Sequence, residues 1–189
     1  MTAESKIFKG QIADNFFLTT SQHKDVEYVH IRRYEKTEDG QKSFPTKKGA
    51  SFTPGRWVAF FDLFTDIDDY IKRHKDGQSV YYHHHIGGGV YVTINDKYRH
   101  VDIRRFFYPS GAKMEQPTKS GICVTFDQWD ILKTLIAKLH KQKPYLLGAV
   151  PCFKQPDHVN LMTVVECKEC NPFSDAVDHN PLNFFSSLE

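Results

Sequence analysis

The sequence predicts an α+β fold built from two copies of one unit, in which four antiparallel strands precede a long helix. The main observation is an internal repeat, because residues 29–57 align without a gap with residues 101–129, 72 positions later. Within each copy, short strand-like segments give way to apolar residues spaced about 3.6 positions apart. The repeat indicates a tandem duplication, and two small units bury more apolar surface when they pack on each other. Identical pairs include Val29/Val101, Ile31/Ile103, Arg32/Arg104, Arg33/Arg105, Pro45/Pro117, Thr46/Thr118, Lys47/Lys119, Gly49/Gly121, Thr53/Thr125 and Trp57/Trp129.

The first copy begins with a polar segment and continues with strand-like stretches. We expect residues 1–15 to form an arm or an edge strand. Residues 37–41 contain the sequence Glu-Asp-Gly, which is typical of a hairpin turn. Segments rich in aromatic and β-branched residues predict strands at residues 15–20, 26–36, 42–48 and 49–52.

A long helix is expected after these strands. Thr53 is a favourable N-cap, and Pro54 suits the first helical position because its missing N–H would have no partner there. An apolar stripe then continues to Ile71, and Gly77 ends the helix. At about 22 residues the helix would be roughly 33 Å long, which exceeds what one small sheet can cover. We therefore predict that the helices of the two copies pack against each other.

The second copy repeats this order after a segment of unusual composition. Residues 77–89 contain three consecutive histidines and three consecutive glycines, and we expect a flexible linker there rather than a metal site. Residues 91–95 and 100–108 have the composition of strands. Thr125 is expected to cap the second helix, which Pro144 ends.

The C-terminal part departs from the repeat. Two apolar runs, YLLGAVPCF and VNLMTVVEC, are expected to form one further hairpin. The last residues, 171–189, mix acidic and aromatic side chains and carry little signal for regular structure. The expected domains are residues 1–76 (first repeat with an N-terminal arm), 77–89 (linker), 90–143 (second repeat) and 144–189 (hairpin and acidic tail).

Charge is distributed unevenly along the chain, although the formal net charge is only +2. Residues 29–48 carry six Lys or Arg against three acids, and residues 97–119 carry six against two. Residues 151–189 reverse this balance, with two Lys against six acids. Two basic blocks indicate a polyanionic ligand that is bound by the repeats and not by the tail.

Motifs in both copies resemble the positive cofactor four family of transcriptional coactivators. Residues 101–107 read VDIRRFF, similar to the family's I-D-I-R-aromatic strand, and residues 117–122 read PTKSGI, similar to its P-x-[KR]-K-G-I segment. The first copy reads PTKKGASF at residues 45–52, and each copy has a Trp near the start of its helix. The resemblance covers roughly residues 14–76 and 90–143, and its motifs recur in the same order and spacing.

The resemblance implies a curved antiparallel sheet in each unit, dimerisation through the helices, and binding of single-stranded nucleic acid across the strands. Family dimers form from two chains, whereas here one chain would supply both halves as a pseudo-dimer. Three positions depart from the family pattern: His30 replaces the acid of I-D-I, Glu35 stands where an aromatic residue is usual, and Ser120 replaces a basic residue. The halves are therefore expected to differ in affinity, and the second to dominate stacking because it is richer in aromatic residues.

Binding of a single strand requires positive charge along the backbone and aromatic faces for unstacked bases. Both copies supply this mixture, although solvated strand edges and core aromatics would have a similar composition. Trp57 and Trp129 open the apolar helix stripes and are expected in the core. The candidate nucleic-acid-binding residues are Arg32, Arg33, Tyr34, Lys36, Lys42, Phe44, Lys47, Lys48, Lys97, Tyr98, Arg99, Arg104, Arg105, Phe106, Phe107, Tyr108, Lys113 and Lys119.

Cysteine spacing gives a weaker signal. Cys167 and Cys170 form a CxxC pair that, with Cys152 and either His158 or His179, could build a zinc site. Only one CxxC is present and it ends an expected strand, so we predict no metal and no other cofactor. The cysteines are expected to be reduced, as in an intracellular protein.

These observations predict a single-stranded DNA-binding protein that acts as a transcription coactivator or a replication accessory factor. RNA binding is an alternative because a stacking surface accepts either sugar, and another is a protein-interaction module that works through the C-terminal extension. No enzyme activity is expected, since the sequence has no phosphate loop, nucleophile elbow or HExxH motif. Without a signal peptide or membrane span, we expect the nucleus, or the host-cell cytoplasm or nucleus if the chain is viral. Expected partners are transcription or replication proteins, and higher homo-oligomers are left open.

Overall fold

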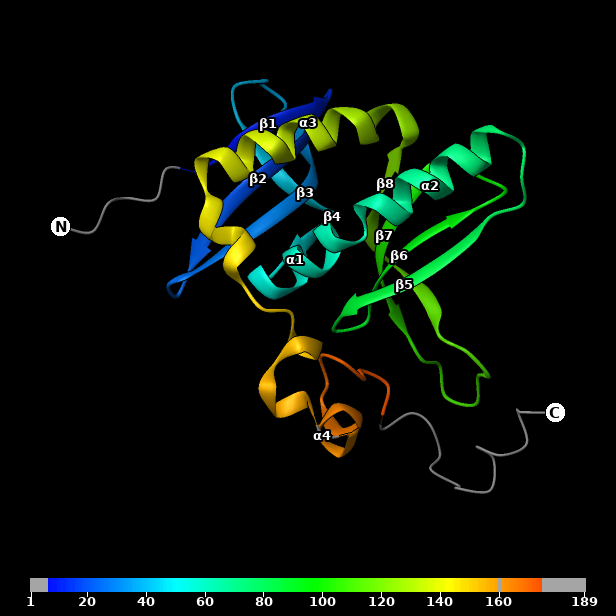
Figure 1. Cartoon of the computed structure of the whole chain (residues 1–189). Helices are drawn as coiled ribbons and strands as arrows, with labels where there is room; N and C mark the ends of the chain where they lie inside the picture. The colour runs from blue at the N-terminus through cyan, green and yellow to red at the C-terminus, as the bar shows by residue number, and fades with distance from the viewer. Residues whose placement is uncertain (1–6, 160, 175–189) are drawn as a thin grey trace.

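The structure is a computed structural model that describes residues 7–159 and 161–174. It contains two four-stranded antiparallel sheets, each followed by helices, which confirms the predicted α+β fold with two repeated units (Figure 1). Within the described ranges, no helix is both long and apolar enough to span a bilayer.

Both sheets have the same order, in which each strand pairs with the next one along the chain. The pairing register shifts after Arg32 in the first sheet and after Arg104, its counterpart 72 residues later, in the second. The repeat therefore extends to this irregularity of the backbone. The first sheet consists of β1 (Lys9–Ala13), β2 (Phe16–His23), β3 (Val26–Lys36) and β4 (Ser43–Phe52). The second consists of β5 (Tyr81–Gly87), β6 (Val90–Asn95), β7 (His100–Phe107) and β8 (Gln116–Thr125).

The linker predicted at residues 77–89 is wrong, because β5 occupies most of this segment as the edge strand of the second sheet. Tyr82 and Ile86, which lie on the same face of the strand, are buried in the core. The three consecutive glycines all have positive φ and make the turn into β6. The composition of residues 77–89 resembles that of a linker, but β5 is the fourth strand of the second sheet. The division of the chain into domains otherwise stays a prediction.

β4 is a single strand where two short strands were predicted, at residues 42–48 and 49–52. Gly49 suggested a break, but it lies inside the strand and pairs with Arg32 of β3. A Cβ atom at Gly49 would lie 2.7 Å from Arg32 Cγ, so the glycine gives the arginine side chain room to cross the strand. Each sheet reaches four strands through the edge strand at its start, which is β1 in the first sheet and β5 in the second.

The helices begin where the sequence predicts. Thr53 caps α1 (Pro54–Asp62) by accepting a hydrogen bond from a backbone N–H in its first turn at 3.4 Å. Thr125 caps α3 (Phe126–Gln142) in the same way at 3.3 Å. In each case the cap lies at the end of the preceding strand, so sheet and helix join without a loop.

The first helix is broken, whereas one continuous helix was predicted. The N–H of Leu63 bonds to the carbonyl of Phe60, three residues back, and this tighter turn separates α1 from α2 (Phe64–Lys75). The turn redirects the chain towards the second sheet (Figure 1). There Tyr70 packs on Tyr82 of β5, with ring centroids 4.8 Å apart.

The helices of the two units pack against each other, as predicted. Trp57 Nε1 of α1 donates to His140 Nε2 of α3 at 2.9 Å, and Trp129 Nε1 of α3 donates to Asp68 Oδ1 of α2 at 2.8 Å. The two tryptophans are 72 residues apart, as are the two acceptors, so one pseudo-two-fold axis relates the two bonds. Both tryptophans are buried, which confirms their expected place in the core.

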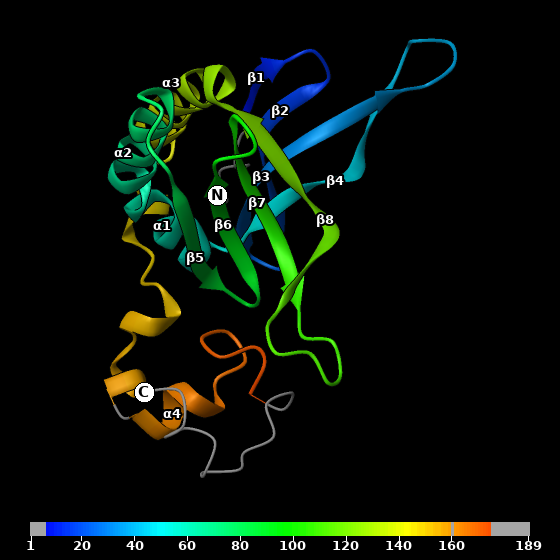
Figure 2. The ribbon, with the colours of Figure 1, turned by 90° about the vertical axis from the view of Figure 1, so that its right-hand side faces the viewer.

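Each helix also covers part of the other unit's sheet. α3 packs on β1 and β2 of the first sheet, where Leu135 lies over Gly10, and α1 contacts β5 of the second sheet as well as β3. Figure 2 shows the three long helices together on one side of the two sheets. A single hydrophobic core therefore contains residues from both units.

The hairpin predicted after residue 144 is wrong. Its described residues form three short 3₁₀ turns and one short helix, because Pro151, inside the first predicted strand, cannot donate the backbone hydrogen bond that a strand pair requires. The elements are η1 (Pro144–Gly148), η2 (Cys152–Lys154), η3 (Pro156–Val159) and α4 (Leu161–Glu166). The acidic and aromatic tail was predicted at residues 171–189, and its part after residue 174 lies outside the described residues.

Candidate nucleic-acid interface

The faces of the sheets that are turned away from the helices carry the polar and aromatic side chains. In β3, Val29 and Ile31 are buried against the helices, so Arg32 lies on the opposite face. β7 repeats this pattern, with Ile103 buried and Arg104 on the opposite face. We call these two surfaces, opposite the buried residues of β3 and β7, the outer faces.

A cavity of about 460 Å³ lies between β4 and β8, where the two sheets contact each other. Within the described part of the chain, its lining contains six cationic side chains and no acidic one. Cations concentrated around one cavity attract a polyanion more strongly than scattered surface charges do. The six, which define the cationic cleft, are Arg32, Lys47, Arg56, Arg104, Arg105 and Lys119.

Two arginines of the cationic cleft are held by equivalent bonds in the two units. Arg32 Nη1 donates to the carbonyl of Thr46 at 2.6 Å, and Arg104 Nη1 donates to the carbonyl of Thr118 at 3.0 Å. A Cβ atom at Gly121 would lie 2.2 Å from Arg104 Cβ, so only glycine leaves this arginine in place. The guanidinium groups are therefore pre-organised before any ligand binds.

The two units differ in how far this charge is neutralised. Arg104 Nε donates to Asp102 Oδ2 at 2.5 Å, and this bond raises the pKa of the arginine further. In the first unit His30 stands in place of Asp102, and burial together with the charge of Arg32 lowers the pKa of this histidine. Among the ion pairs of the described residues none involves Arg32. At this pair of equivalent positions, Arg32 therefore carries the less compensated positive charge.

Beside each arginine lies a cluster of two aromatic rings and one basic side chain, which we call a triad. In the first triad, Lys9 Nζ lies 4.5 Å from the ring centroid of Phe17 and 5.3 Å from that of Tyr34. The two rings are themselves 5.3 Å apart and nearly perpendicular. The side chains come from β1, β2 and β3, so the triad crosses three strands of the first sheet.

The second triad has the same construction, with His83 in place of the lysine. His83 lies 4.5 Å from Tyr91 and 5.1 Å from Phe106, centroid to centroid, and the latter two rings are 4.9 Å apart. His83 also bonds Glu115 at 2.9 Å, so this triad has an acidic neighbour. His85 lies beside Tyr91 at 4.9 Å, and burial lowers the pKa of His85 to about 4.

The triads and the cationic cleft form one continuous path. Phe17 pairs directly with Arg32 across the first sheet, and Arg32 pairs with Gly49 at the cleft. In the second sheet Tyr91 pairs with Arg104, which pairs with Gly121. The order across the molecule is therefore triad, arginine, cleft, arginine, triad.

The structure brings together seven of the eighteen predicted binding residues and disperses the rest. Arg32, Lys47, Arg104, Arg105 and Lys119 line the cationic cleft, while Tyr34 and Phe106 belong to the triads. Arg33 stacks on Phe16, with its guanidinium carbon 4.8 Å from the ring centroid, and Tyr108 lies beside Phe173. The exposed side chains Lys36, Lys42, Phe44, Lys48, Phe107 and Lys113 lie in or beside the β3–β4 and β7–β8 hairpins, and Lys97, Tyr98 and Arg99 lie in the β6–β7 turn.

Sequence reasoning did not find several residues of this surface. Lys9 lies in β1, Phe17 in β2 and Tyr91 in β6, and their partners in the triads come from other strands. Phe17 is half-buried between the buried Phe16 and Leu18, so its side chain lies on the opposite face of the strand from theirs. The histidines of β5 were missed because the segment was interpreted as a linker, and Arg56 because it lies in a helix.

A group of metal-ligating side chains lies apart from the outer faces, in the segment that follows α3. One ligand atom from each of Cys152, His158, Cys167 and Cys170 lies within 4.8 Å of all the others. Hydrogen bonds from the backbone of Cys170 and from His158 lower the pKa of Cys167 to about 6, whereas burial raises that of Cys170 to about 12. These are the cysteines singled out from the sequence, and the structure brings them together in a turn and not at the end of a strand.

Comparison with known proteins agrees with the resemblance drawn from the sequence motifs. Residues 11–63 match the family described as "Transcriptional Coactivator p15 (PC4)", from β1 to the break after α1. A protein of Caenorhabditis elegans named "Putative RNA polymerase II transcriptional coactivator" is 38% identical over 58 residues, which cover 31% of this chain and 47% of the relative. The chain thus matches about half the length of this relative. No solved structure matches the chain.

Proposed function

We propose that this chain, which carries a p15 (PC4) coactivator domain in its first unit, binds single-stranded DNA along its outer faces and acts in transcription. The proposal rests above all on the order of side chains across the two sheets, from triad to arginine, cleft, arginine and triad. Phosphates would occupy the cationic cleft, and bases on either side would stack on the aromatic rings.

A single strand suits this surface better than a duplex. In a duplex the bases stack on one another, so the rings of Phe17 and Tyr91 could not reach their faces, and only the cationic cleft would contribute. In a single strand the bases are free to turn towards the protein. The triads therefore supply the preference for single strands, and the cleft supplies most of the charge-dependent affinity.

The role in transcription is supported by the comparisons. The matched family is one of transcriptional coactivators, and the C. elegans relative carries the same description. A coactivator would work in the nucleus, or in the compartment where a virus transcribes its genes, and would contact other transcription proteins. A replication accessory factor would use the same surface, because it also protects or presents single strands.

The test compares single-stranded DNA, duplex DNA and RNA of about 20 nucleotides by fluorescence anisotropy at about 0.15 M salt. Phe17→Ala and Tyr91→Ala each remove one ring from a triad. Stacking contributes about 1–3 kcal/mol per base, so each variant should weaken single-strand binding by roughly 5- to 150-fold. Phe153→Ala is the matched control, since Phe153 is an exposed aromatic residue of the C-terminal segment, outside the triads.

Two results would count against the proposal. Equal affinity for the single strand and the duplex would remove the role assigned to the triads. An equal loss in Phe153→Ala would show that the effect is not specific to them. Tighter binding of RNA than of DNA would keep the stacking surface but identify the ligand as RNA.

A further inference from the structure

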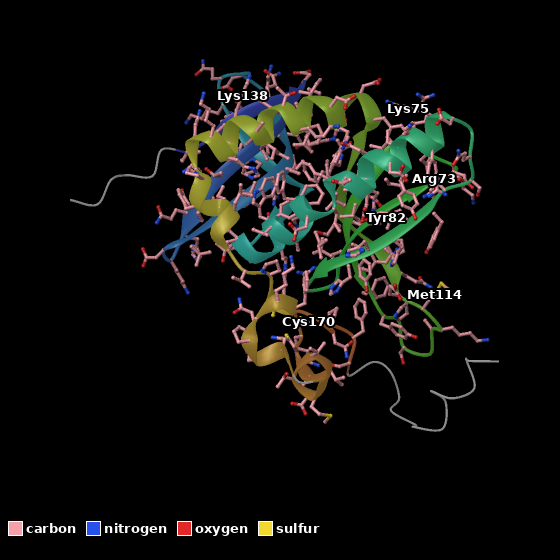
Figure 3. The ribbon with its side chains drawn as sticks, viewed as in Figure 1. Arg73, Lys75, Tyr82, Met114, Lys138 and Cys170 are labelled. Atoms are coloured by element: carbon pink, nitrogen blue, oxygen red, sulfur yellow. The ribbon has the colours of Figure 1, made fainter. Side chains whose placement is uncertain are left out.

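The segment after α3 places four potential metal ligands around one point. Cys152 lies in η2, His158 in η3, and Cys167 and Cys170 in the turn after α4. Figure 3 labels Cys170 in this segment, below the helices and sheets. The ligands come from three separate turns of the chain, so their convergence is a property of the fold and not of a short sequence motif.

Two of the distances between the ligand atoms are those of a tetrahedral zinc site, and all of them are within 4.8 Å. With Zn–S bonds of about 2.3 Å and Zn–N bonds of about 2.0–2.1 Å, two sulfurs on one ion lie about 3.8 Å apart, and a sulfur and a nitrogen about 3.6 Å. Cys152 Sγ lies 3.7 Å from Cys167 Sγ and 3.7 Å from His158 Nε2. The three cysteines are free thiols rather than disulfide partners.

The segment lacks a hydrophobic core of its own. Between residues 148 and 174, only Pro151 and Ser174 are buried among the side chains that the structure describes. Val150, Phe153 and Met162 are 50%, 52% and 62% exposed. The α-helix described in it, α4, has six residues, far below the length at which an isolated helix is stable. Small segments of this kind are normally held by disulfides or by a metal.

The segment is nevertheless fixed to both units. Glu169, between the two cysteines of the CxxC pair, forms an ion pair with Arg56, and its carbonyl accepts the N–H of Gly88 at 2.7 Å. Lys154 Nζ bonds Asp62 Oδ2 at 2.8 Å. A metal that orders the turn would therefore also place Glu169 against an arginine of the cationic cleft.

We propose that Cys152, His158, Cys167 and Cys170 bind one Zn²⁺ in a closed structural site. Three sulfurs and one imidazole nitrogen complete a four-coordinate shell, which leaves no open position for a water or a substrate. Zinc suits this set because it accepts thiolate and imidazole ligands and does not change its oxidation state. The ion holds the C-terminal segment folded against α1 and the β5–β6 turn.

The experiment measures the metal content of the full chain, purified with a non-thiol reductant and dialysed into metal-free buffer. Elemental analysis should find about one Zn per chain, and cobalt substitution should give the intense visible absorption of a tetrahedral thiolate site. Cys167→Ser and Cys170→Ser should lose the metal. Cys123→Ser is the matched control and should retain it, since Cys123 lies in β8 away from the cluster.

Three outcomes would overturn the proposal: substoichiometric zinc in the wild-type chain that added Zn²⁺ does not restore, iron in place of zinc, or equal metal loss in Cys123→Ser and Cys167→Ser. Because a serine variant could fail to fold, the wild-type chain is also stripped with a chelator and titrated with Zn²⁺. Uptake of one equivalent with recovery of the circular dichroism spectrum supports the site. No saturable uptake refutes it.

Discussion

Lys47 and Lys119 provide the clearest test of the cationic cleft. They are equivalent positions in the two units, both are exposed, and neither takes part in an ion pair of the described residues. Replacing both with Ala should therefore leave stability nearly unchanged. If each lysine neutralises one phosphate, the double variant should show a shallower slope of log K, the association constant for a single strand, against log salt. The difference is about 1.4, at about 0.7 per phosphate. We take the plots of log K against log salt for the wild type and the double variant to meet near 1 M salt. The affinity of the variant is then roughly 15-fold below that of the wild type at about 0.15 M salt and roughly 65-fold below it at about 0.05 M.

The control is a second pair of exposed lysines, Lys75 at the end of α2 and Lys138 on α3. Figure 3 shows both on the helices, which cover the faces of the sheets opposite the outer faces. Lys75→Ala/Lys138→Ala changes the net charge by the same amount but should leave the salt slope within about 0.3 of the wild type. Binding is measured by anisotropy at four or more salt concentrations. An unchanged slope in Lys47→Ala/Lys119→Ala, or an equal change in the control, would refute the assignment of the cationic cleft.

Three further predictions follow from single positions. Gly121→Ala should lower the free energy of unfolding by about 1–3 kcal/mol in urea titrations, because the new Cβ would lie 2.2 Å from Arg104 Cβ. The loss should be larger than that in Gly49→Ala, and a loss below about 0.3 kcal/mol would contradict this account. Burial lowers the pKa of His140, so the unfolded chain takes up its proton first and the melting temperature should fall as pH drops below about 6.5. His140→Asn should weaken that dependence, and an identical pH profile would be evidence against it. Glu169→Gln frees Arg56 from its ion pair, so single-strand binding should tighten and the salt slope steepen by about 0.7; a weaker or unchanged affinity would show that Arg56 does not face the ligand.

Much of the fold could be predicted because local signals agree with the final environment. The bounds of β3 match the prediction, and the buried Val29 and Ile31 alternate with half-buried neighbours in its middle. Thr53 and Thr125 fixed the helix starts, because a cap acts through hydrogen bonds within one turn. The break at Leu63 could not be predicted in this way. Its neighbours in sequence favour a continuous helix, and the turn places α2 over a sheet formed much later in the chain.

The residues of the candidate site also fall into those with a local signal in the sequence and those that only the fold brings together. The cationic residues could be identified because charge is visible in the sequence without knowledge of partners. The triads could not, since Lys9, Phe17 and Tyr34 come from three strands and meet only through the register of the sheet. The cluster around Cys152 was underestimated for a related reason, because the apolar runs beside it predicted a hairpin. Pro151, inside the first of those runs, was the signal against it.

The crossed packing of the helices also has a consequence for how the chain acquires its structure. β1 and β2 of the first sheet lie within the first 23 residues, yet the helix that covers them, α3, begins at residue 126. During synthesis the first sheet therefore leaves the ribosome with part of its apolar face uncovered until the second half of the chain follows. Contacts this distant in sequence slow folding and prolong the exposure of strand edges. The first unit should consequently depend on the second for its own folding.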